Sequence, residues 1–190
     1  DIRYPESVTE EVYRKIKTGK ENIVLTGMPG SGKSTFARAL EAKTSLPLYY
    51  LDMIYWNPDR TTKPKEEFRA SLRETVALPE WIIDGNYAST MDIRLDACDT
   101  VFFLDYPTDV CLGGVLERRG KPRSDMPWVE TEEDGEFIGF IKNFEEKQKP
   151  QILELLGKYS EKNVIIFKSR EESAEFLKNK KSKTKNHGKQ

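Results

Sequence analysis

The sequence predicts an α/β fold in which a parallel sheet is covered by helices on both faces. Three observations lead to this prediction. Short apolar runs, rich in β-branched and aromatic residues, alternate with stretches of helical periodicity. A glycine-rich loop, residues 27–32, joins the first long apolar run to a helical stretch. Acidic residues end several of the runs, which is typical of folds that bind ligands beyond the carboxyl ends of parallel strands.

An amphipathic helix is predicted over residues 7–17, ahead of the first strand. Val8, Val12 and Ile16 are spaced four apart there, and the helix starts with a capping-box pattern. Five later runs are predicted to be buried strands because they are short, apolar and bounded by turn residues. These strands are residues 22–27, 47–52, 80–85, 100–105 and 163–167.

The segments between the strands have helical spacing. Phe68, Leu72 and Val76 form the apolar stripe of a helix over residues 64–78, with Pro64 near its first turn. Further helices are predicted over residues 33–43, 107–119, 136–156 and 171–177. Pro150 should interrupt or kink the longest of them.

Composition favours a single domain over residues 1–177, followed by a flexible, lysine-rich tail over residues 178–190. Hydrophobic residues make up 37% of the chain and charged residues 33%, a balance typical of globular proteins. The chain has 31 basic and 32 acidic residues, and six of the lysines lie in the tail, so the remainder carries a net charge of −7. Because phosphate contacts dominate DNA affinity, an acidic body should touch nucleic acid only weakly, through the tail.

No apolar run is long enough to cross a bilayer, and the first residues are too polar for a secretory signal. Cys98 and Cys111 lack the spacing of metal ligands, so both are expected to be buried free thiols in a reducing compartment. We therefore expect a cytoplasmic protein without a membrane partner, either a monomer or a homodimer.

The glycine-rich loop continues into GMPGSGKS, residues 27–34, which matches G-x-x-x-x-G-K-[ST] at every fixed position. Its glycines let backbone amides turn inward around a phosphate, and the following helix adds its N-terminal dipole. Lys33 is expected to meet the β and γ phosphates, and Ser34 to offer its hydroxyl to Mg²⁺. ATP and Mg²⁺ are thus the predicted cofactors. The predicted nucleotide contacts here are Gly27, Met28, Pro29, Gly30, Ser31, Gly32, Lys33, Ser34 and Thr35.

This motif occurs in kinases, ATPase motors and GTPase switches alike. The chain has 190 residues, which leaves room for a core and one lid but little for the extra modules of a motor. The N-K-x-D sequence that reads guanine in GTPase switches is absent. A small kinase is therefore the favoured class.

Asp84 ends the run WIID, and this position predicts a carboxylate that supports Mg²⁺ and faces the substrate. An aspartate that caps the next turn is the alternative. Gly85 should let a ligand approach closely. Asp52 ends the run LYYLD and could align and deprotonate an acceptor, or cap a helix. Tyr55 and Trp56 could wall an acceptor ring or belong to the core.

Arg118, Arg119 and Arg123 stand at the start of a predicted lid, about residues 119–135. Planar guanidinium groups match the charge of a transferring phosphoryl group, which makes these arginines catalytic candidates. The alternative is a solvated basic patch that pairs with the acidic residues 130–136.

Two more positions are candidate ligand contacts. Arg94 could hold an acceptor phosphate or form a surface ion pair, and Tyr87 is grouped with it as an acceptor contact. Ser169 and Arg170 follow the fifth strand, where the nucleotide base is expected, and Arg119 is added to the nucleotide contacts.

Three segments around the phosphate loop resemble the bacterial topology modulation (FlaR-like) proteins, which are P-loop proteins related to adenylate kinase. The segments are LDMIYWNP, WIIDGNYASTMDIRLDACDTVFFLDYP and EFIGFIKNFEEK, and the resemblance covers roughly residues 22–177. It implies the nucleoside monophosphate kinase fold, with a five-stranded parallel sheet in the order 2-3-1-4-5 and a lid. The positions that match the family pattern are Lys33, Ser34, Asp52, Asp84, Arg94, Arg118, Arg119 and Arg123.

The chain departs from this pattern at Thr108, Gly113 and Gly114, where relatives often carry Arg, Trp and Arg. An arginine at position 114 would stack on adenine, so its absence leaves the choice between ATP and GTP open. The leading hypothesis is a Mg²⁺-ATP-dependent phosphotransferase that moves the γ-phosphoryl group to a small acceptor, with nucleotides among the candidates. The alternative is an ATP-binding regulatory protein that affects DNA topology without small-molecule kinase activity.

Overall fold

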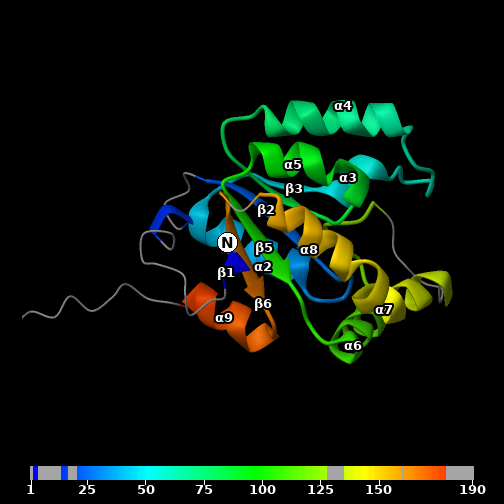
Figure 1. Cartoon of the computed structure of the whole chain (residues 1–190). Coiled ribbons are helices and arrows are strands. Elements are labelled where there is room, and N and C mark those ends of the chain that lie inside the picture. The colour runs from blue at the N-terminus through cyan, green and yellow to red at the C-terminus, as the bar shows by residue number, and fades with distance from the viewer. Residues whose placement is uncertain (1, 4–13, 17–20, 128–134, 160, 179–190) are drawn as a thin grey trace, which may run out of the picture.

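The computed structural model describes residues 2–3, 14–16, 21–127, 135–159 and 161–178. The described residues form a six-stranded parallel sheet in the spatial order β1-β6-β5-β2-β4-β3 (Figure 1). The strands are β1 (Ile2–Arg3), β2 (Asn22–Gly27), β3 (Leu48–Tyr50), β4 (Trp81–Asp84), β5 (Thr100–Leu104) and β6 (Asn163–Phe167). Counted along the chain, the five predicted strands lie in the order 2-3-1-4-5, which confirms the fold class. The strand β1, which was not predicted, pairs with β6 at the edge.

The strands inside the sheet are more deeply buried than the edge strand β3, all of whose residues are half-buried. Every residue of β4 and β5 is buried, which is why these runs are apolar without alternation. The prediction for residues 47–52 is partly wrong, because β3 ends at Tyr50 and helix α3 (Leu51–Tyr55) begins there. Tyr50 pairs with Asp84, the last residue of β4, so the ladder ends where its partner strand ends.

The predicted helices are present at close to the expected bounds. They are α2 (Lys33–Thr44), α4 (Lys65–Val76), α6 (Thr108–Arg118), α7 (Gly135–Lys147), α8 (Lys149–Gly157) and α9 (Arg170–Lys178). The break between α7 and α8 falls at Gln148, and Pro150 stands in the first turn of α8, as its lack of a backbone N–H requires.

Besides β1 and α3, two more short elements escaped prediction, and one predicted helix is only partly described. The 3₁₀ turn η2 (Ala88–Thr90) and helix α5 (Met91–Ala97) span too few residues to show a helical period. Of the helix predicted over residues 7–17, residues 14–16 are helical and Ile16 is fully buried. The rest of that segment and the predicted tail, apart from Lys178, lie outside the described residues.

A row of phenylalanine rings joins helices and strands on one face of the sheet. Phe36 of α2 lies 5.3 Å from Phe102 of β5, between ring centroids, and Phe176 of α9 lies 5.4 Å from Phe167 of β6. Helices α2 and α9 therefore share this face. Helices α4 and α5 lie together at the top of Figure 1, whereas α6 and α7 lie at the bottom.

The cysteines and the apolar segments of the helices bear on two further expectations. Cys98 and Cys111 are buried free thiols, as predicted. Among the described residues, no helix is both long enough and apolar enough to cross a bilayer.

Candidate active site

The phosphate loop joins β2 to α2 and bends back on itself, with the Ser31 amide donating to the carbonyl of Met28 at 3.1 Å. Gly30 has φ 83°, a left-handed conformation that side chains disfavour. A Cβ at Gly30 would also lie 2.0 Å from the carbonyl oxygen of Cys111 in α6. The glycines of the motif thus serve the contact with α6 as well as the bend of the loop.

Gly114 is the matching feature on α6. A Cβ at this position would lie 2.3 Å from the carbonyl oxygen of Gly30, whereas a Cβ at Gly113 would meet nothing within 4 Å. Gly114 therefore lets α6 press against the phosphate loop. Any larger side chain there, including the arginine common in the resembling family, would have to push the two apart.

Ser34, in the first turn of α2, contacts the carboxylate predicted to support a metal ion. Its hydroxyl lies 2.8 Å from Oδ2 of Asp84, which is buried at the end of β4. Burial raises the pKa of Asp84, while the positive charge of Lys33 and the hydrogen bond from Ser34 oppose the shift. Oδ1 of Asp84 is buried and has no hydrogen-bond partner among the described residues. The alternative reading of Asp84 as a turn cap is not supported, since neither η2 nor α5 has a side-chain cap bond.

Asp125, which the sequence interpretation missed, lies on the other side of the same hydroxyl. Its Oδ2 is 3.0 Å from the Ser34 hydroxyl, and its Oδ1 is 3.2 Å from Nε of Arg123. Ser124 accepts a hydrogen bond from Arg38 of α2 at 3.3 Å, which also holds this segment. One acid among many charges in residues 121–134 gave no sequence signal for this position.

The loop after β4 supports the phosphate loop through a residue that the sequence interpretation quoted but did not assign. Oδ1 of Asn86 accepts hydrogen bonds from the Gly27 amide and the Thr26 hydroxyl, each at 3.0 Å. The expectation that Gly85 lets a ligand approach is not met. The space beside it is taken by Leu51, whose side chain would lie 2.7 Å from a Cβ at this position.

Arg94 holds the same loop from beneath, which corrects the expectation that it meets an acceptor phosphate or forms a surface pair. The side chain is fully buried, and its guanidinium donates to the carbonyls of Gly85, Asn86 and Tyr87. Burial lowers the pKa of Arg94 to about 10, and the nearby charge of Asp84 opposes this shift, so the group stays protonated at neutral pH.

Asp52 lies in the first turn of α3 and meets Tyr87 across the site. The Tyr87 hydroxyl donates to Oδ1 of Asp52 at 2.5 Å, and burial together with this carboxylate raises the pKa of the phenol. The ring of Tyr55 lies 4.8 Å from that of Tyr87 and 5.3 Å from that of Trp56, between centroids. The predicted acceptor residues Asp52, Tyr55, Trp56 and Tyr87 are thus one connected group.

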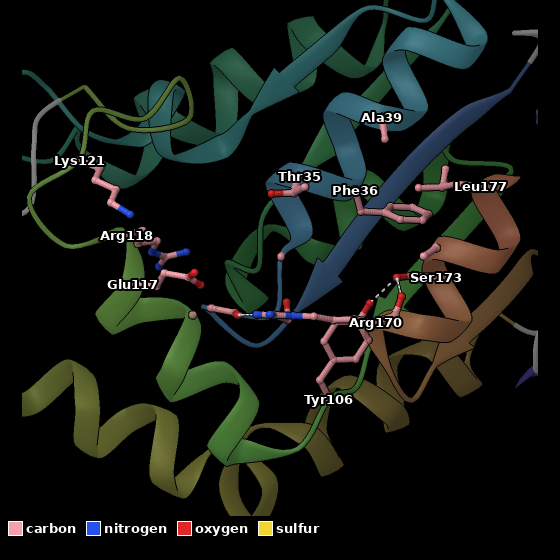
Figure 2. A pocket seen from close by; sticks show the side chains of 15 residues that line it. Thr35, Phe36, Ala39, Tyr106, Glu117, Arg118, Lys121, Arg170, Ser173 and Leu177 are labelled. Atoms are coloured by element: carbon pink, nitrogen blue, oxygen red, sulfur yellow. Dashed lines mark hydrogen bonds between the residues drawn. The ribbon is translucent and has the colours of Figure 1, made fainter.

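A cavity of about 500 Å³ opens beside the phosphate loop, between α2, α6 and α9 (Figure 2). Arg170 and Arg118 line it, and Arg170 donates to the carbonyl of Gly30 at 3.3 Å. Figure 2 shows the Tyr106 hydroxyl pointing to Ser173, at 2.8 Å. Of the other predicted nucleotide contacts, Ser169 instead accepts a hydrogen bond from the Glu172 amide at the start of α9, and Arg119 does not line the cavity.

The residues present fit a magnesium ion that arrives with a nucleotide. Within the described residues, no group of three or more His, Cys, Asp or Glu side chains could hold a metal by itself. Magnesium commonly takes one or two carboxylates and completes its shell with phosphate oxygens and water. The Ser34 hydroxyl and the unpartnered oxygen of Asp84 supply hard oxygen ligands of that kind.

Comparison with solved structures shows that the fold is similar to that of several kinases. The shikimate kinase of Acinetobacter baumannii in complex with shikimate is 17% identical with a TM-score of 0.57, over 87% of this chain and 94% of that chain. The shikimate kinase of Bacteroides thetaiotaomicron is 20% identical with a TM-score of 0.52, over 82% and 93%. A sugar kinase from a Janibacter species is 17% identical with a TM-score of 0.50, over 83% and 90%. No protein-family model and no curated protein matches the chain.

Proposed function

We propose that the chain is a Mg²⁺-ATP-dependent phosphotransferase, similar to adenylate kinase, that moves the γ-phosphoryl group to a small acceptor. The strongest support is a contact of Ser34, the last residue of the complete phosphate-loop motif. Its hydroxyl lies 2.8 Å from Oδ2 of the buried Asp84. Nucleotides are among the candidate acceptors. The likeness to topology modulation proteins rests on the sequence segments alone and is part of this proposal.

The phosphate loop would hold the triphosphate through its backbone amides and the start of α2. Lys33 would stand against the β and γ oxygens, where negative charge grows as the bond to the leaving ADP breaks. When bound, Mg²⁺ would neutralise charge on the same oxygens, with Ser34 and Asp84 as its protein ligands. Arg118, at the far side of the loop, would add charge that a planar guanidinium can share between two oxygens.

The nucleoside would occupy the cavity beside the loop. Its lining offers Arg170, Tyr106 and Ser173, an arginine plane with two hydroxyl groups, to a purine. The position of Arg170 supports a stacking role that an arginine at position 114 would otherwise fill. Because these groups do not distinguish adenine from guanine, both ATP and GTP belong in any test.

The acceptor would bind at Asp52. The hydrogen bond from Tyr87 holds the Asp52 carboxylate in one orientation, and a base must be fixed in this way to take the proton of an acceptor hydroxyl. The rings of Tyr55 and Tyr87 beside it, tilted 57° to each other, would give a sugar or base ring an aromatic surface to pack against.

A coupled assay of ADP and GDP release tests the proposal. The panel of acceptors includes nucleoside monophosphates, nucleosides, sugars and shikimate, with water as the blank. Sugars and shikimate are included because the structural neighbours are a sugar kinase and shikimate kinases. We expect at least one acceptor to raise nucleotide turnover well above the blank. Lys33→Met should lower that rate by about 10²–10³-fold, the loss typical of removing one charge-stabilising donor.

Lys43→Met is the matched control, because Lys43 is an exposed lysine in the last turn of the same helix. It should leave the rate within twofold. Turnover that no acceptor raises above the blank would overturn the transferase proposal. Retention on DNA that requires ATP would then favour the regulatory alternative.

A further inference from the structure

Asp125 is a buried acid that the proposed chemistry does not yet use. It belongs to the segment that follows α6, residues 119–127, and it is 7% exposed. The chain separates it from Ser34 by 91 residues, so the contact between them is a tertiary one. Buried carboxylates are rare without a charged or metal partner.

The hydroxyl of Ser34 has more acceptors than it can serve. It lies 2.8 Å from Oδ2 of Asp84 and 3.0 Å from Oδ2 of Asp125, but a serine hydroxyl has one hydrogen. At any moment, one of the two carboxylates therefore faces an oxygen lone pair. A cation bound by all three oxygens would remove this conflict.

A second observation points to the same cation. Oδ1 of Asp84 is buried without a hydrogen-bond partner among the described residues, and Asp84 as a whole is only 4% exposed. An unsatisfied buried carboxylate oxygen is costly unless something binds there. Two carboxylates and a hydroxyl form a set of hard ligands that suits a small divalent ion.

The pair with Arg123 explains only part of this arrangement. Arg123 contacts Oδ1 of Asp125 at 3.2 Å, and a structural ion pair would need nothing more. It does not account for the other oxygen, Oδ2, which lies 3.0 Å from the Ser34 hydroxyl.

We propose that Asp125 is a third oxygen ligand of the magnesium site, together with Ser34 and Asp84. The proposal rests on the proposed function, since the ion is the one that accompanies the nucleotide. It makes the segment 119–127 part of the metal site. Without the metal, the Asp125 carboxylate would face the phosphates and weaken nucleotide binding; with the metal, it would strengthen binding.

Metal affinity, measured separately from activity, tests this role. Mn²⁺ replaces Mg²⁺ in an electron paramagnetic resonance titration of the protein–ADP complex, and calorimetry follows ADP in EDTA. Asp125→Asn should weaken Mn²⁺ binding by about 10- to 100-fold. In EDTA it should leave ADP affinity unchanged or raise it, because a negative charge has gone. Asp109→Asn, an exposed acid in the first turn of α6, is the control and should change neither.

The structural alternative makes the opposite forecast. If Asp125 only holds Arg123, then Arg123→Met should weaken Mn²⁺ binding as much as Asp125→Asn does, and that result would overturn the proposal. So would an Asp125→Asn protein that loses ADP affinity equally with and without metal. Wild-type protein that binds no nucleotide would instead refute the proposed function.

A measurement on unaltered protein covers the case in which the variants fail to fold. Trypsin can cleave after Arg119 and Arg123, both within the segment. With Mg²⁺ and ADP, cleavage there should be at least severalfold slower than with ADP in EDTA, because the metal ties the segment to α2 and β4. Equal cleavage rates would contradict a ligand carried by this segment.

Discussion

The aspartates at the carboxyl ends of β4 and β5 can be compared directly. Asp84 is the last residue of β4 and Asp105 directly follows β5, and the two strands flank β2, which leads into the phosphate loop. Their surroundings differ completely. Asp84 meets one hydroxyl and keeps a buried oxygen without a partner, whereas Oδ2 of Asp105 lies 2.9 Å from Nζ of Lys149 and 2.5 Å from Nζ of Lys168.

A position at a strand end is therefore not enough to make an acid functional. The carboxylate of Asp105 already has two cations, so it has little affinity left for a metal. The positive charges of Lys33 and the buried Arg94 interact with the Asp84 carboxylate, but its Oδ1 has no hydrogen-bond partner among the described residues. An acid with coordination capacity to spare is the better candidate for chemistry.

The largest effect should be the difference in phosphotransfer rate between the variants that lack one or the other of these two acids. Asp84→Asn should lower phosphotransfer by about 10²–10³-fold, because transition-state charge loses its metal support. Asp105→Asn weakens two ion pairs, to Lys149 and Lys168, that take no part in the proposed chemistry, and it should leave the rate within threefold. Steady-state rates with Mg²⁺-ATP and the best acceptor measure both, and equal losses would erase the distinction.

The next largest effect should be on stability, through the loop that follows Asp84, because the buried Arg94 donates hydrogen bonds to that loop. Arg94→Ala leaves carbonyls of Gly85, Asn86 and Tyr87 without their donor and should lower the free energy of unfolding by about 3 kcal/mol. Urea unfolding followed by circular dichroism measures it.

Arg69→Ala is the comparison variant. Arg69 donates to the carbonyl of Ser89 and pairs with the half-exposed Asp92, so its loss should cost about 1 kcal/mol or less. If the two variants were equally stable, Arg94 would not be the support described above.

The β5 side of the site can be tested through α6, which follows it. Gly114→Ala should lower the free energy of unfolding by about 1–3 kcal/mol and weaken nucleotide binding, because the new methyl group meets the carbonyl of Gly30. Gly113→Ala should raise stability by about 0.5–1 kcal/mol, since alanine favours helix and meets no obstacle. Thermal unfolding with and without nucleotide separates them, and effects of the same sign would contradict the close contact.

The smallest effect is the pH dependence of the metal-free protein. Burial raises the pKa of Asp84 above its unfolded value, so the folded state binds the proton more tightly. The stability this contributes is present at low pH and is lost as pH rises through the folded pKa. Asp84→Asn should remove that part of the decline in urea unfolding measured in EDTA. An unchanged pH profile would mean that Asp84 does not carry the shift.

The sequence alone predicts five of the six described strands, one of them with a wrong end, as well as most helices and the place of the phosphate loop. The order of the strands in the sheet came instead from the family resemblance. The features predicted from the residues themselves are local. Apolar runs, helical spacing and the glycine-lysine-serine pattern each lie within a few residues of the chain, and their physics depends on near neighbours. Even the helix break just before Pro150 follows from one missing backbone donor.

The contacts of each polar residue, by contrast, depend on how the whole chain folds. The tertiary structure placed Arg94 beneath a loop, gave Gly114 its role against Gly30, and brought Asp125 to Ser34 across 91 residues. It also brought Lys168 to the Asp105 carboxylate, although 63 residues of chain separate the two. A carboxylate's role depends on which charges stand around it, and those charges come from distant parts of the chain that meet only when the protein folds.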